Sequence, residues 1–453
     1  MSPIPPAQAP MNATTIVVGL GATGLSCARY LQAQGVAVTV VDTRSQPPAL
    51  EQLQAELPDV PVHAGPLDAE RILTASTLVL SPGVSPREPL FEQARAQGIE
   101  VVGDIELFAR RATAPIVAIT GANGKSTVTC LLTAMARACG RDVRMGGNIG
   151  TPALDLLQAE EPDLYVLELS SFQLDTVESL DAAAAAVLNI SPDHMDRYDS
   201  LADYTLSKQR VYRGHGVMVL NADDTRVVQM AENGREQIRC TLGVPEAGEF
   251  GLREDIATGP CLAYGTQPLM PVAELRLQGR HNLANALAAL ALGHAIGLER
   301  DGMYRALKEF SGLPHRCERV AERQGVLWIN DSKGTNVGAT AAALAGYAGR
   351  RVILIAGGVG KGADFTPLAQ AARGVVSDAI LFGRDAGLLQ QALAGVVRTH
   401  PVAGLDAAVT MAAGLTGSGD VVLFSPACAS LDMFANYIAR GEAFVVAVRG
   451  LPT

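Results

Sequence analysis

The stretch from Ile116 to Thr127 constrains the fold of this chain more than any other segment. It reads Ile-Val-Ala-Ile-Thr-Gly-Ala-Asn-Gly-Lys-Ser-Thr, so a short apolar run enters a glycine-containing turn that ends in a lysine and two hydroxyl residues. Apolar residues then recur at helical spacing from Val128 to Cys139. A buried strand that passes through a tight turn into a helix is the repeating unit of parallel α/β sheets.

The same turn has the chemistry of a phosphate-binding loop. Glycine lets backbone N–H groups face an anion, the helix N-terminus adds a favourable dipole, Lys125 brings a positive charge and Ser126 offers a hydroxyl ligand for Mg²⁺. The usual pattern G-x-x-x-x-G-K-[ST] would place glycine where this chain has Ile119, and Gly121 makes a shorter loop. An ordinary strand-to-helix turn with a surface lysine is the alternative. We favour a nucleoside triphosphate site because a strand and a helix flank the loop as the motif requires.

Short apolar runs alternate with helical segments along almost the whole chain, which predicts an α/β fold with mainly parallel sheets. The alanine run at 182–186 is interpreted as a helix end that leads into a buried strand at Val187–Ile190. The runs expected to form strands are Thr14–Gly19, Val36–Asp42, Thr77–Ser81, Ile116–Thr120, Leu164–Leu169, Ala185–Ile190, Val217–Asn221, Val352–Ala356, Ala379–Phe382 and Asp420–Ser425.

Length and composition narrow the class of protein. A chain of 453 residues with 48% hydrophobic residues suggests about three domains, each with a packed core. Its apolar runs fall well short of the ~18 residues of a membrane span. Residues 1–10 lack the features of a signal peptide and are expected to form a disordered tail, so we expect a cytoplasmic protein. The formal net charge of -10 argues against a bulk nucleic-acid partner.

The pattern predicts three domains, at 1–104, 105–312 and 313–453. The first is expected to be a Rossmann-like unit, the second a phosphate-loop ATPase-type unit and the third another Rossmann-like α/β unit. Residues 238–278 show short strands and few helix signals, which indicates a small β insertion in the central domain.

A second glycine pattern, Gly19-x-Gly21-x-x-Gly24, lies between an expected strand and an expected helix, and Asp42 follows about 20 residues later. Taken alone this pattern predicts a dinucleotide enzyme. The turn would serve any nucleoside diphosphate equally well, and a turn that only packs helix on strand remains the structural alternative.

Two further side chains stand where a metal-assisted site would need them, although a solvated strand-end glutamate and a polar surface histidine are the alternatives, and a third side chain gives no such signal. Glu168 ends an expected strand, where a carboxylate beside a phosphate loop can bind the Mg²⁺ of ATP. His194 follows another strand end and is flanked by Asp193 and Asp196. Lys208 lies in an expected helix, and the bare sequence would leave it a solvated surface charge.

Jointly the motifs strongly resemble those of the Mur ligases, the ATP-dependent amide-forming enzymes of peptidoglycan precursor synthesis. The resemblance covers nearly all of the chain beyond the first ten residues. Its motifs are Gly-Leu-Gly-Ala-Thr-Gly at 19–24, Gly-Asp-Ile-Glu-Leu-Phe at 103–108, Thr-Gly-Ala-Asn-Gly-Lys-Ser-Thr at 120–127, Gly-Gly-Asn-Ile-Gly at 146–150, Leu-Glu-Leu-Ser-Ser-Phe-Gln-Leu at 167–174, Asp-His-Met-Asp-Arg-Tyr at 193–198, Leu-Pro-His-Arg at 313–316, Asn-Asp-Ser-Lys-Gly-Thr-Asn at 330–336 and Ser-Pro-Ala-Cys-Ala-Ser-Leu-Asp at 425–432.

The resemblance implies two nucleotide sites. The first domain would hold the UDP end of a nucleotide sugar, so its glycine pattern would not serve nicotinamide. The UDP-substrate residues would be Gly21, Thr23, Asp42, Thr43, Arg44, Gly83, Asn148 and Ser170. The ATP residues would be Gly121, Asn123, Gly124, Lys125, Ser126, Thr127, Asn282, Asn285, Arg316 and Asp331.

The resemblance also implies metal, catalytic and amino-acid sites. One Mg²⁺ would lie on Ser126 and Glu168 and a second on His194 and Lys208, with Lys208 converted to a carbamate by CO₂. That reaction needs a neutral amine, which burial among residues such as Tyr204 and Leu206 would favour. The catalytic residues would be Lys125, Glu168, His194 and Lys208, and the incoming amino acid would contact Lys333, Thr335, Lys361, Ser430, Leu431 and Tyr437.

The activity implied by the resemblance is addition of D-glutamate to UDP-N-acetylmuramoyl-L-alanine, with ATP consumed through an acyl phosphate. We expect a cytoplasmic monomer with no nucleic-acid or membrane partner. Val359 and Tyr437 stand where the family often has aspartate and phenylalanine, which leaves a ligase for L-glutamate or another amino acid as the first alternative. An NAD-dependent oxidoreductase and a non-catalytic nucleotide-binding protein are the others.

Overall fold

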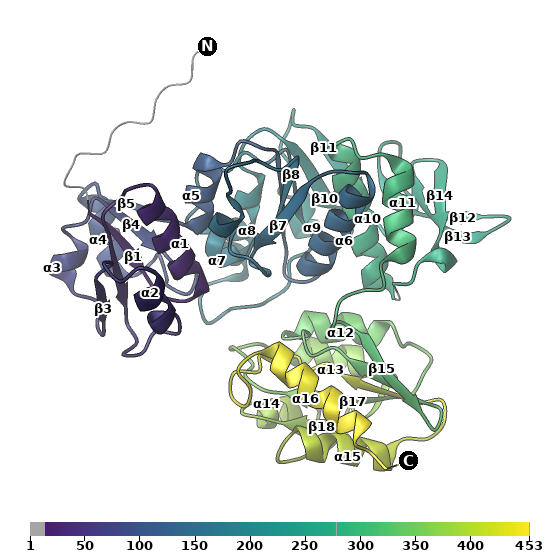
Figure 1. Ribbon diagram of the computed structural model, residues 1–453. Coiled ribbons are helices and arrows are strands. Elements are labelled where there is room, and N and C mark those ends of the chain that lie inside the picture. The colour runs from purple at the N-terminus through teal and green to yellow at the C-terminus, as the bar shows by residue number, and fades with distance from the viewer. Residues whose placement is uncertain (1–13, 278, 453) are drawn as a thin grey trace.

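The computed structural model describes residues 14–277 and 279–452, and the tail expected at residues 1–10 lies outside these ranges. The chain forms three α/β units, each built on its own sheet (Figure 1). The expected fold class, a mainly parallel α/β protein, is confirmed. We name these the N-terminal unit (strands β1–β5), the central unit (β6–β14) and the C-terminal unit (β15–β20).

The N-terminal unit has a five-stranded sheet in the order β3-β2-β1-β4-β5, parallel throughout. Gly24 is needed here because a Cβ at this position would lie 1.9 Å from the carbonyl oxygen of Gly19, so only glycine lets the first helix approach its strand. The elements are β1 Thr15–Val18, α1 Ala22–Ala33, β2 Val38–Asp42, α2 Leu50–Glu56, β3 Val62–Ala64, α3 Ala69–Ile72, β4 Thr77–Leu80, α4 Pro89–Ala96 and β5 Glu100–Gly103.

The central unit has a nine-stranded sheet in the order β14-β13-β12-β11-β10-β9-β6-β8-β7. The strands expected at 238–278 are present, and they continue one edge of this sheet. The elements are α5 Asp104–Arg111, β6 Ile116–Thr120, α6 Lys125–Ala138, β7 Val143–Gly147, β8 Leu164–Glu168, α7 Ser171–Leu174, β9 Ala184–Val187, α8 Leu201–Gln209, β10 Val217–Asn221, α9 Thr225–Val228, β11 Gln237–Cys240, β12 Phe250–Asp255, β13 Gly259–Tyr264, β14 Gln267–Pro271, α10 Arg280–Ala295 and α11 Arg300–Glu309, with 3-10 turns at Ala153–Leu156, Arg210–Tyr212 and Val272–Glu274.

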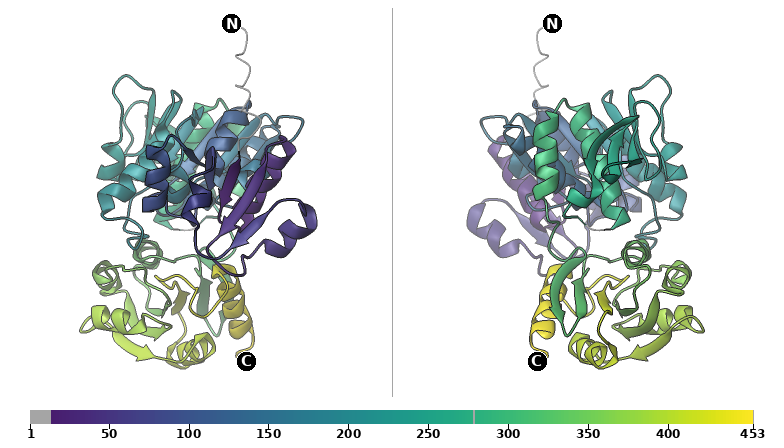
Figure 2. Two further views of the ribbon diagram at one scale, coloured as in Figure 1. Left: turned by 90° about the vertical axis from the view of Figure 1, so that its left-hand side faces the viewer. Right: turned by 90° about the vertical axis from the view of Figure 1, so that its right-hand side faces the viewer.

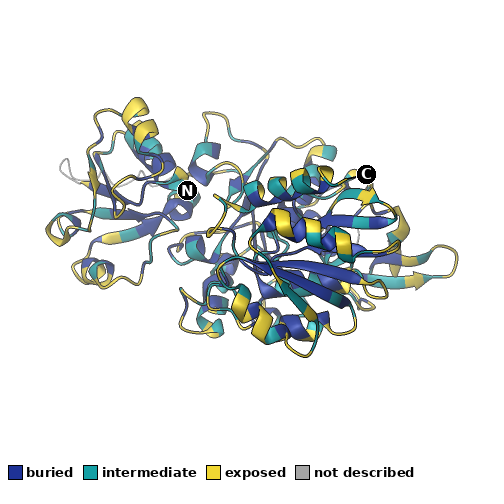
Figure 3. Ribbon diagram, turned by 90° about the horizontal axis from the view of Figure 1, so that it is seen from below, coloured by how far each residue is buried: buried dark blue, intermediate teal, exposed yellow. Residues whose placement is uncertain are grey.

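The C-terminal unit has a six-stranded sheet in the order β15-β16-β20-β17-β18-β19, in which only β15 is antiparallel to its neighbour. Seen from below, its strands are buried between helices whose outer faces are exposed (Figure 3). The elements are β15 Glu318–Arg323, β16 Val326–Asn330, α12 Val337–Ala345, β17 Val352–Gly357, α13 Thr366–Ala372, β18 Val376–Phe382, α14 Ala386–Leu393, β19 Arg398–Pro401, α15 Leu405–Leu415, β20 Val421–Phe424 and α16 Tyr437–Arg449.

All ten apolar runs expected to be strands contain one, but the alanine run was misassigned. Ala184 to Val187 are themselves the strand β9, fully buried between β6 and β10, and no helix ends there. Alanine favours helices in isolation, whereas here its small side chain fits the crowded middle of the sheet.

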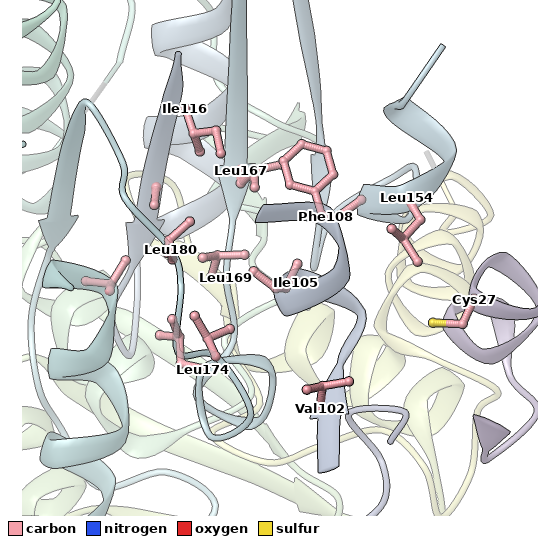
Figure 4. Close-up of a cluster of buried hydrophobic side chains, with 14 of the residues drawn as sticks. Cys27, Val102, Ile105, Phe108, Ile116, Leu154, Leu167, Leu169, Leu174 and Leu180 are labelled. Atoms are coloured by element: carbon pink, nitrogen blue, oxygen red, sulfur yellow. The ribbon is translucent and has the colours of Figure 1, made fainter. Parts of the chain in front are cut away.

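One apolar cluster joins the N-terminal and central units. Cys27 of α1, Val102 of β5 and Phe108 of α5 belong to the same cluster as Leu154 and Leu167 of the central unit (Figure 4). The C-terminal unit has two apolar clusters of its own, which include no residue from the other two units. The side views show the C-terminal unit below the other two (Figure 2). Polar side chains contact the central unit across this interface.

Candidate active site

The phosphate-binding loop has the geometry that the sequence predicts. Strand β6 ends at Thr120, helix α6 begins at Lys125, and Gly124 between them has φ +85°, in the left-handed region. The Lys125 amine donates to the carbonyl oxygens of Gly121 and Ala122 at 2.9 and 3.1 Å, so the side chain curls over its own loop. Such a lysine is placed to exchange these carbonyls for phosphate oxygens.

The loop is held from outside by an amide side chain. Asn189, which follows β9, accepts a hydrogen bond from the backbone N–H of Asn123 at 2.8 Å and donates to its carbonyl oxygen at 3.0 Å. A Cβ on Gly124 would come within 2.3 Å of the Asn285 Oδ1 atom. Glycine is therefore required here for both its backbone conformation and its lack of a side chain.

A cavity of about 350 Å³ opens beside the loop, between the central and C-terminal units. Gly121 in the adjoining loop and Lys125 and Ser126 at the start of α6 do not line this cavity. Arg316, which precedes β15, reaches across to donate to the Ser126 hydroxyl at 2.5 Å. The expected ATP residues that line this cavity are Asn123, Gly124, Thr127, Asn282, Asn285, Arg316 and Asp331.

Glu168 ends β8 beside this loop and is 2% exposed. Its Oε1 atom accepts from the Asn148 amide at 2.7 Å, whereas its buried Oε2 atom has no hydrogen-bond partner. Burial alone would raise the pKa of this carboxyl, but the Lys125 charge and the polar side chains of Ser126 and Asn148 hold that pKa below its usual value. A buried, ionised oxygen without a partner next to a serine hydroxyl fits a divalent cation of the Mg²⁺ type.

His194 has a left-handed backbone, with φ 57°. Its ring packs edge-on against Phe172 with the ring centres 4.8 Å apart. Burial lowers the pKa of this imidazole to about 4, with the Asp193 charge acting in the opposite direction, so the ring is neutral near pH 7. Within the described ranges, no three His, Cys, Asp or Glu side chains gather into a metal-binding group, so His194 does not form a ready-made metal centre with its acidic neighbours.

Lys208 is 1% exposed, which confirms the burial that carbamate formation would need. Its amine lies 3.3 Å from the Thr120 hydroxyl and 4.7 Å from the centre of the Tyr204 ring. Burial, followed by the repulsion of the Lys125 charge, lowers the pKa of Lys208 well below the usual lysine value. Leu206, expected in this buried shell, is instead 60% exposed because it faces outward from α8.

A second cavity, of about 560 Å³, lies where the N-terminal unit meets the central unit. Asp42 at the end of β2 accepts from the Leu20 backbone and pairs with the Arg44 guanidinium at 2.6 Å. Burial opposes ionisation, but the hydrogen bonds from Arg44 and Leu20 lower the pKa of Asp42 to about 2. The expected UDP-substrate residues that line this cavity are Gly21, Thr23, Asp42, Thr43, Arg44, Gly83 and Asn148.

Ser170 is the one expected UDP-substrate residue outside this lining, because its hydroxyl caps helix α7 instead. Its capping partner Gln173 does line the cavity, and sequence reasoning missed it. The Gln173 amide donates to the buried Asp104 carboxylate at 2.9 Å, which fixes its orientation. A serine followed three residues later by glutamine was the available signal.

The residues expected to hold the amino acid follow three neighbouring strands of the C-terminal unit. The Lys333 amine lies 4.0 Å above the Tyr437 ring, and Lys361 forms an ion pair with Asp193 of the central unit. Ser430 is buried, Thr335 is half-buried, and Leu431 is 72% exposed at the rim. Loops at the carboxyl ends of adjacent strands form the usual ligand crevice of such sheets.

Asn336 was missed by the sequence analysis, although it lies in one of the quoted motifs. Its side chain donates to the Asn123 Oδ1 atom at 3.1 Å and to the Asp193 Oδ2 atom at 3.0 Å. With Arg316 and Lys361 it joins the C-terminal unit to the phosphate loop and to the His194 loop. Only the folded structure could reveal a contact between residues more than 140 positions apart.

Comparison with known proteins identifies the family of this chain. The family model "Mur ligase MurD-like, N-terminal domain" matches residues 13–103, "Mur ligase middle domain" matches 119–293, and "Mur ligase, glutamate ligase domain" matches 315–428. A UDP-N-acetylmuramoylalanine--D-glutamate ligase of Nitrosococcus oceani is 56% identical over 98% of both chains. The chain belongs to the Mur ligase family. The relative of the same name from Pseudomonas aeruginosa is 52% identical over 96% of this chain and 98% of its own.

Solved structures show the same Mur ligase fold at low sequence identity. A pseudomurein peptide ligase from Methanothermus fervidus aligns with TM-score 0.61 and 17% identity, over 96% of this chain and 99% of its own. A UDP-N-acetylmuramate-alanine ligase from Thermotoga maritima aligns with TM-score 0.60 and 18% identity over the same shares. No helix in the described part of this Mur ligase is both long enough and apolar enough to cross a membrane.

Proposed function

We propose that this Mur ligase joins D-glutamate to UDP-N-acetylmuramoyl-L-alanine in cytoplasmic peptidoglycan precursor synthesis, acting as a monomer with domains at 1–104, 105–312 and 313–453. The observation that carries the proposal is a pair of cavities at the two boundaries of the central unit, each lined by seven of the residues expected for its nucleotide. The names of relatives at 56% and 52% identity over nearly the full length support the choice of substrates.

The chemistry follows from the groups at the site. A carboxylate is a poor acceptor for an amine at neutral pH, so ATP first transfers its γ-phosphoryl group to the carboxylate of the nucleotide sugar peptide. Lys125 and Arg316 would offset the charge of that transfer. The amine of D-glutamate then attacks the acyl carbon, and phosphate leaves through a tetrahedral intermediate. No nucleophilic side chain is needed, because the site works by positioning and by charge stabilisation.

Divalent cations would complete this site. Ser126 and Glu168 would hold one Mg²⁺, and His194 with Lys208 would hold the second. Bound there, Mg²⁺ supplies neutralisation of phosphate charge. The neutral Lys208 amine would form an N–C bond with CO₂ and release one proton, which gives an anionic oxygen ligand. The low pKa and full burial of Lys208 support this carbamate.

Phosphate release from ATP tests the proposal directly. With UDP-N-acetylmuramoyl-L-alanine present, release should depend strongly on added D-glutamate and be far weaker with L-glutamate or other amino acids. Preference for another amino acid would make the protein a different Mur-type ligase. Equal release without either substrate would make it a plain ATPase. Quenching of protein fluorescence by NADH, but not by UDP-sugars, would favour the oxidoreductase alternative.

A further inference from the structure

The second cavity lies between two units, and the central unit contributes the smaller share of its lining. Among the described residues that share consists of Gly147, Asn148 and Gln173. Asn148 and Gln173 both end in a carboxamide, and each donates to a buried carboxylate. The Asn148 amide bonds to Glu168 at 2.7 Å, and the Gln173 amide bonds to Asp104 at 2.9 Å. Glu168 belongs to the proposed metal site, whereas Asp104 lines neither cavity.

Asp104 lies where the N-terminal and central units meet. It is the first residue of α5, directly after β5 of the N-terminal sheet, and it is 2% exposed. Burial raises the pKa of Asp104 to about 6, while the Gln173 hydrogen bond and the backbone at the start of α5 act in the opposite direction. The carboxyl is therefore mostly ionised above pH 7. The Cys27 thiol of α1, on which the Asp104 charge acts, stays neutral because burial raises its pKa well above the usual thiol value.

The other end of the Gln173 amide is also bonded. Its Oε1 atom accepts from the backbone N–H and the hydroxyl of Ser170, at 3.1 and 3.2 Å, in the capping box that starts α7. A carboxamide has two N–H donors, and Asp104 takes one of them. One N–H of Gln173 therefore remains for a ligand in the cavity. The bonds to Asp104 and Ser170 together hold the amide in this orientation.

The backbone around this contact is closely fitted. A Cβ on Gly103, the last residue of β5, would lie 2.2 Å from the Thr176 hydroxyl, just after α7. That hydroxyl donates in turn to the Gln173 carbonyl at 3.2 Å. The end of the N-terminal sheet is thus pressed against the short helix that carries Gln173, which places Asp104 within reach of the Gln173 amide.

The place of Gln173 in the cavity selects one half of the proposed substrate. Asp42, Thr43 and Arg44, expected to meet the uridine end, line the cavity from the N-terminal unit. The reacting carboxylate has to reach the phosphate loop of the central unit, so the sugar and peptide end would lie on the central side, with Gln173. A sugar ring and a peptide offer hydroxyl and carbonyl oxygens, which are the acceptors that a free N–H binds.

We propose that Asp104 is a positioning residue of the nucleotide-sugar site: it holds the Gln173 amide so that one N–H faces the sugar and peptide end of the substrate. This inference rests on the proposed function and adds to it a residue that does not itself contact the substrate. Without the carboxylate, Gln173 could turn its amide, whereas the lining from the N-terminal unit would be unchanged. Binding of the whole substrate and binding of UDP alone should therefore respond differently.

Calorimetric titration of the full-length Asp104→Ala variant tests this difference, with a saturating non-hydrolysable ATP analogue and no D-glutamate. The Kd for UDP-N-acetylmuramoyl-L-alanine should rise about fivefold to tenfold, the effect expected when one hydrogen bond to the ligand is lost. The Kd for UDP should change less than about twofold. Asp104→Asn, which retains one acceptor oxygen for Gln173, should recover most of the affinity. A merely structural role would change the Kd of both ligands alike, or of neither.

Glu106→Ala is the matched control. Glu106 lies two residues further along α5, is 1% exposed, and accepts hydrogen bonds from the backbone and hydroxyl of Ser179. It lines neither cavity. This variant should lower the melting temperature and leave both Kd values unchanged. A selective loss of affinity for the whole substrate in this control, equal to that of Asp104→Ala, would overturn the proposal.

A second variant keeps the test decisive if Asp104→Ala does not fold. Gln173→Glu preserves the capping box, which accepts either residue, but removes the N–H donor. It should raise the Kd for the whole substrate about as much as Asp104→Ala, and the double variant should show no further rise, because both changes remove the same contact. Additive effects, or an unchanged Kd in the folded variants, would overturn the role of Asp104. Absence of D-glutamate-dependent phosphate release in the unaltered enzyme would instead overturn the proposed function itself.

Discussion

Lys125 illustrates how a single side chain can be prepared for its ligand. Its amine now bonds to two carbonyls of its own loop, and burial, together with nearby positive charges, lowers its pKa from the usual lysine value. A phosphate would replace those neutral carbonyls with anionic oxygens, which bind a cation about twice as strongly. Under the proposed function, the lysine is held where charge would develop during phosphoryl transfer.

Replacing Lys125 with alanine should reduce turnover by at least about 100-fold, because one preorganised cation at the transferring group would be lost. The measurement is phosphate release at saturating substrates. Calorimetric titration with UDP-N-acetylmuramoyl-L-alanine serves as the folding control, since Lys125 does not line that cavity. A variant that kept more than a third of the turnover would favour a non-catalytic nucleotide-binding protein.

Gly124 gives a prediction about stability. Gly124→Ala should cost more than about 2 kcal/mol of unfolding free energy, because it combines a left-handed backbone with a Cβ placed 2.3 Å from Asn285. Gly140, at the other end of α6, has φ +79° and nothing within 4 Å of an added Cβ. Gly140→Ala should therefore cost only the conformational strain of about 1 kcal/mol. If urea unfolding shows the same loss of free energy for both variants, the Asn285 contact does not contribute to the cost of Gly124→Ala.

At this scale the sequence predicts residues whose role depends on local context. Lys125 and Glu168 could be placed because each follows a strand that the apolar pattern identifies. Asn336 could not, because its partners Asn123 and Asp193 come from distant segments and its local sequence is an ordinary helix start.

At the scale of secondary-structure elements, Glu106 is one of the acids that tie helix α5 to the rest of the central unit. Glu106 is buried and accepts hydrogen bonds from the backbone of Glu178 and Ser179, from the Ser179 hydroxyl and from Arg110. Burial raises the pKa of Glu106, but these donors outweigh it and hold the pKa below the usual value. The ionised form is thus the one that holds α5 in place.

Glu106 therefore contributes stability that is present above its unfolded pKa and is lost as the pH falls through its lower folded value. The Glu106→Gln variant should lose about 1–3 kcal/mol of unfolding free energy at pH 7. The glutamine NH₂ group is itself a donor, so it would lie against the existing N–H and O–H donors without forming a hydrogen bond. Below about pH 4.5, the unfolding free energy of this variant should also depend less on pH than that of the unaltered protein. Urea unfolding across pH measures both effects, with the exposed Glu92→Gln on α4 as control. Parallel pH profiles for both variants would argue against this role.

Element type was predictable wherever a strand is bounded by turns, as in β6 and β10, whose ends match the expected runs. The alanine strand β9 was not, because helix propensity favours a different structure from the one that tertiary packing imposes. The edge strands β12–β14 were expected as strands, but their continuity with the central sheet depends on pairing across residues 240 and 250, which no local pattern specifies.

At the scale of the whole molecule, the C-terminal unit meets the phosphate loop through polar side chains such as Arg316, Asn336 and Lys361. Substrate groups would compete for several of these contacts. We expect the C-terminal unit to close further when ligands bind, as domain closure does around ligands generally.

Small-angle scattering with a non-hydrolysable ATP analogue and UDP-N-acetylmuramoyl-L-alanine should show a smaller radius of gyration than the free protein. Asn336→Ala should weaken this compaction, because it removes a contact to both Asn123 and Asp193. Identical scattering curves with and without ligands would contradict closure.

The apolar cluster that joins Cys27 and Val102 to Leu167 has a consequence for how the protein melts. Two units that share a core lose it together, whereas the third keeps separate cores and should respond to heat on its own. Differential scanning calorimetry of the free protein should record two endotherms, the larger from the joined pair. Trypsin added near the temperature of the lower transition should release an intact fragment that ends close to residue 312. A single endotherm and no such fragment would mean that polar contacts alone make the three units unfold in one cooperative transition.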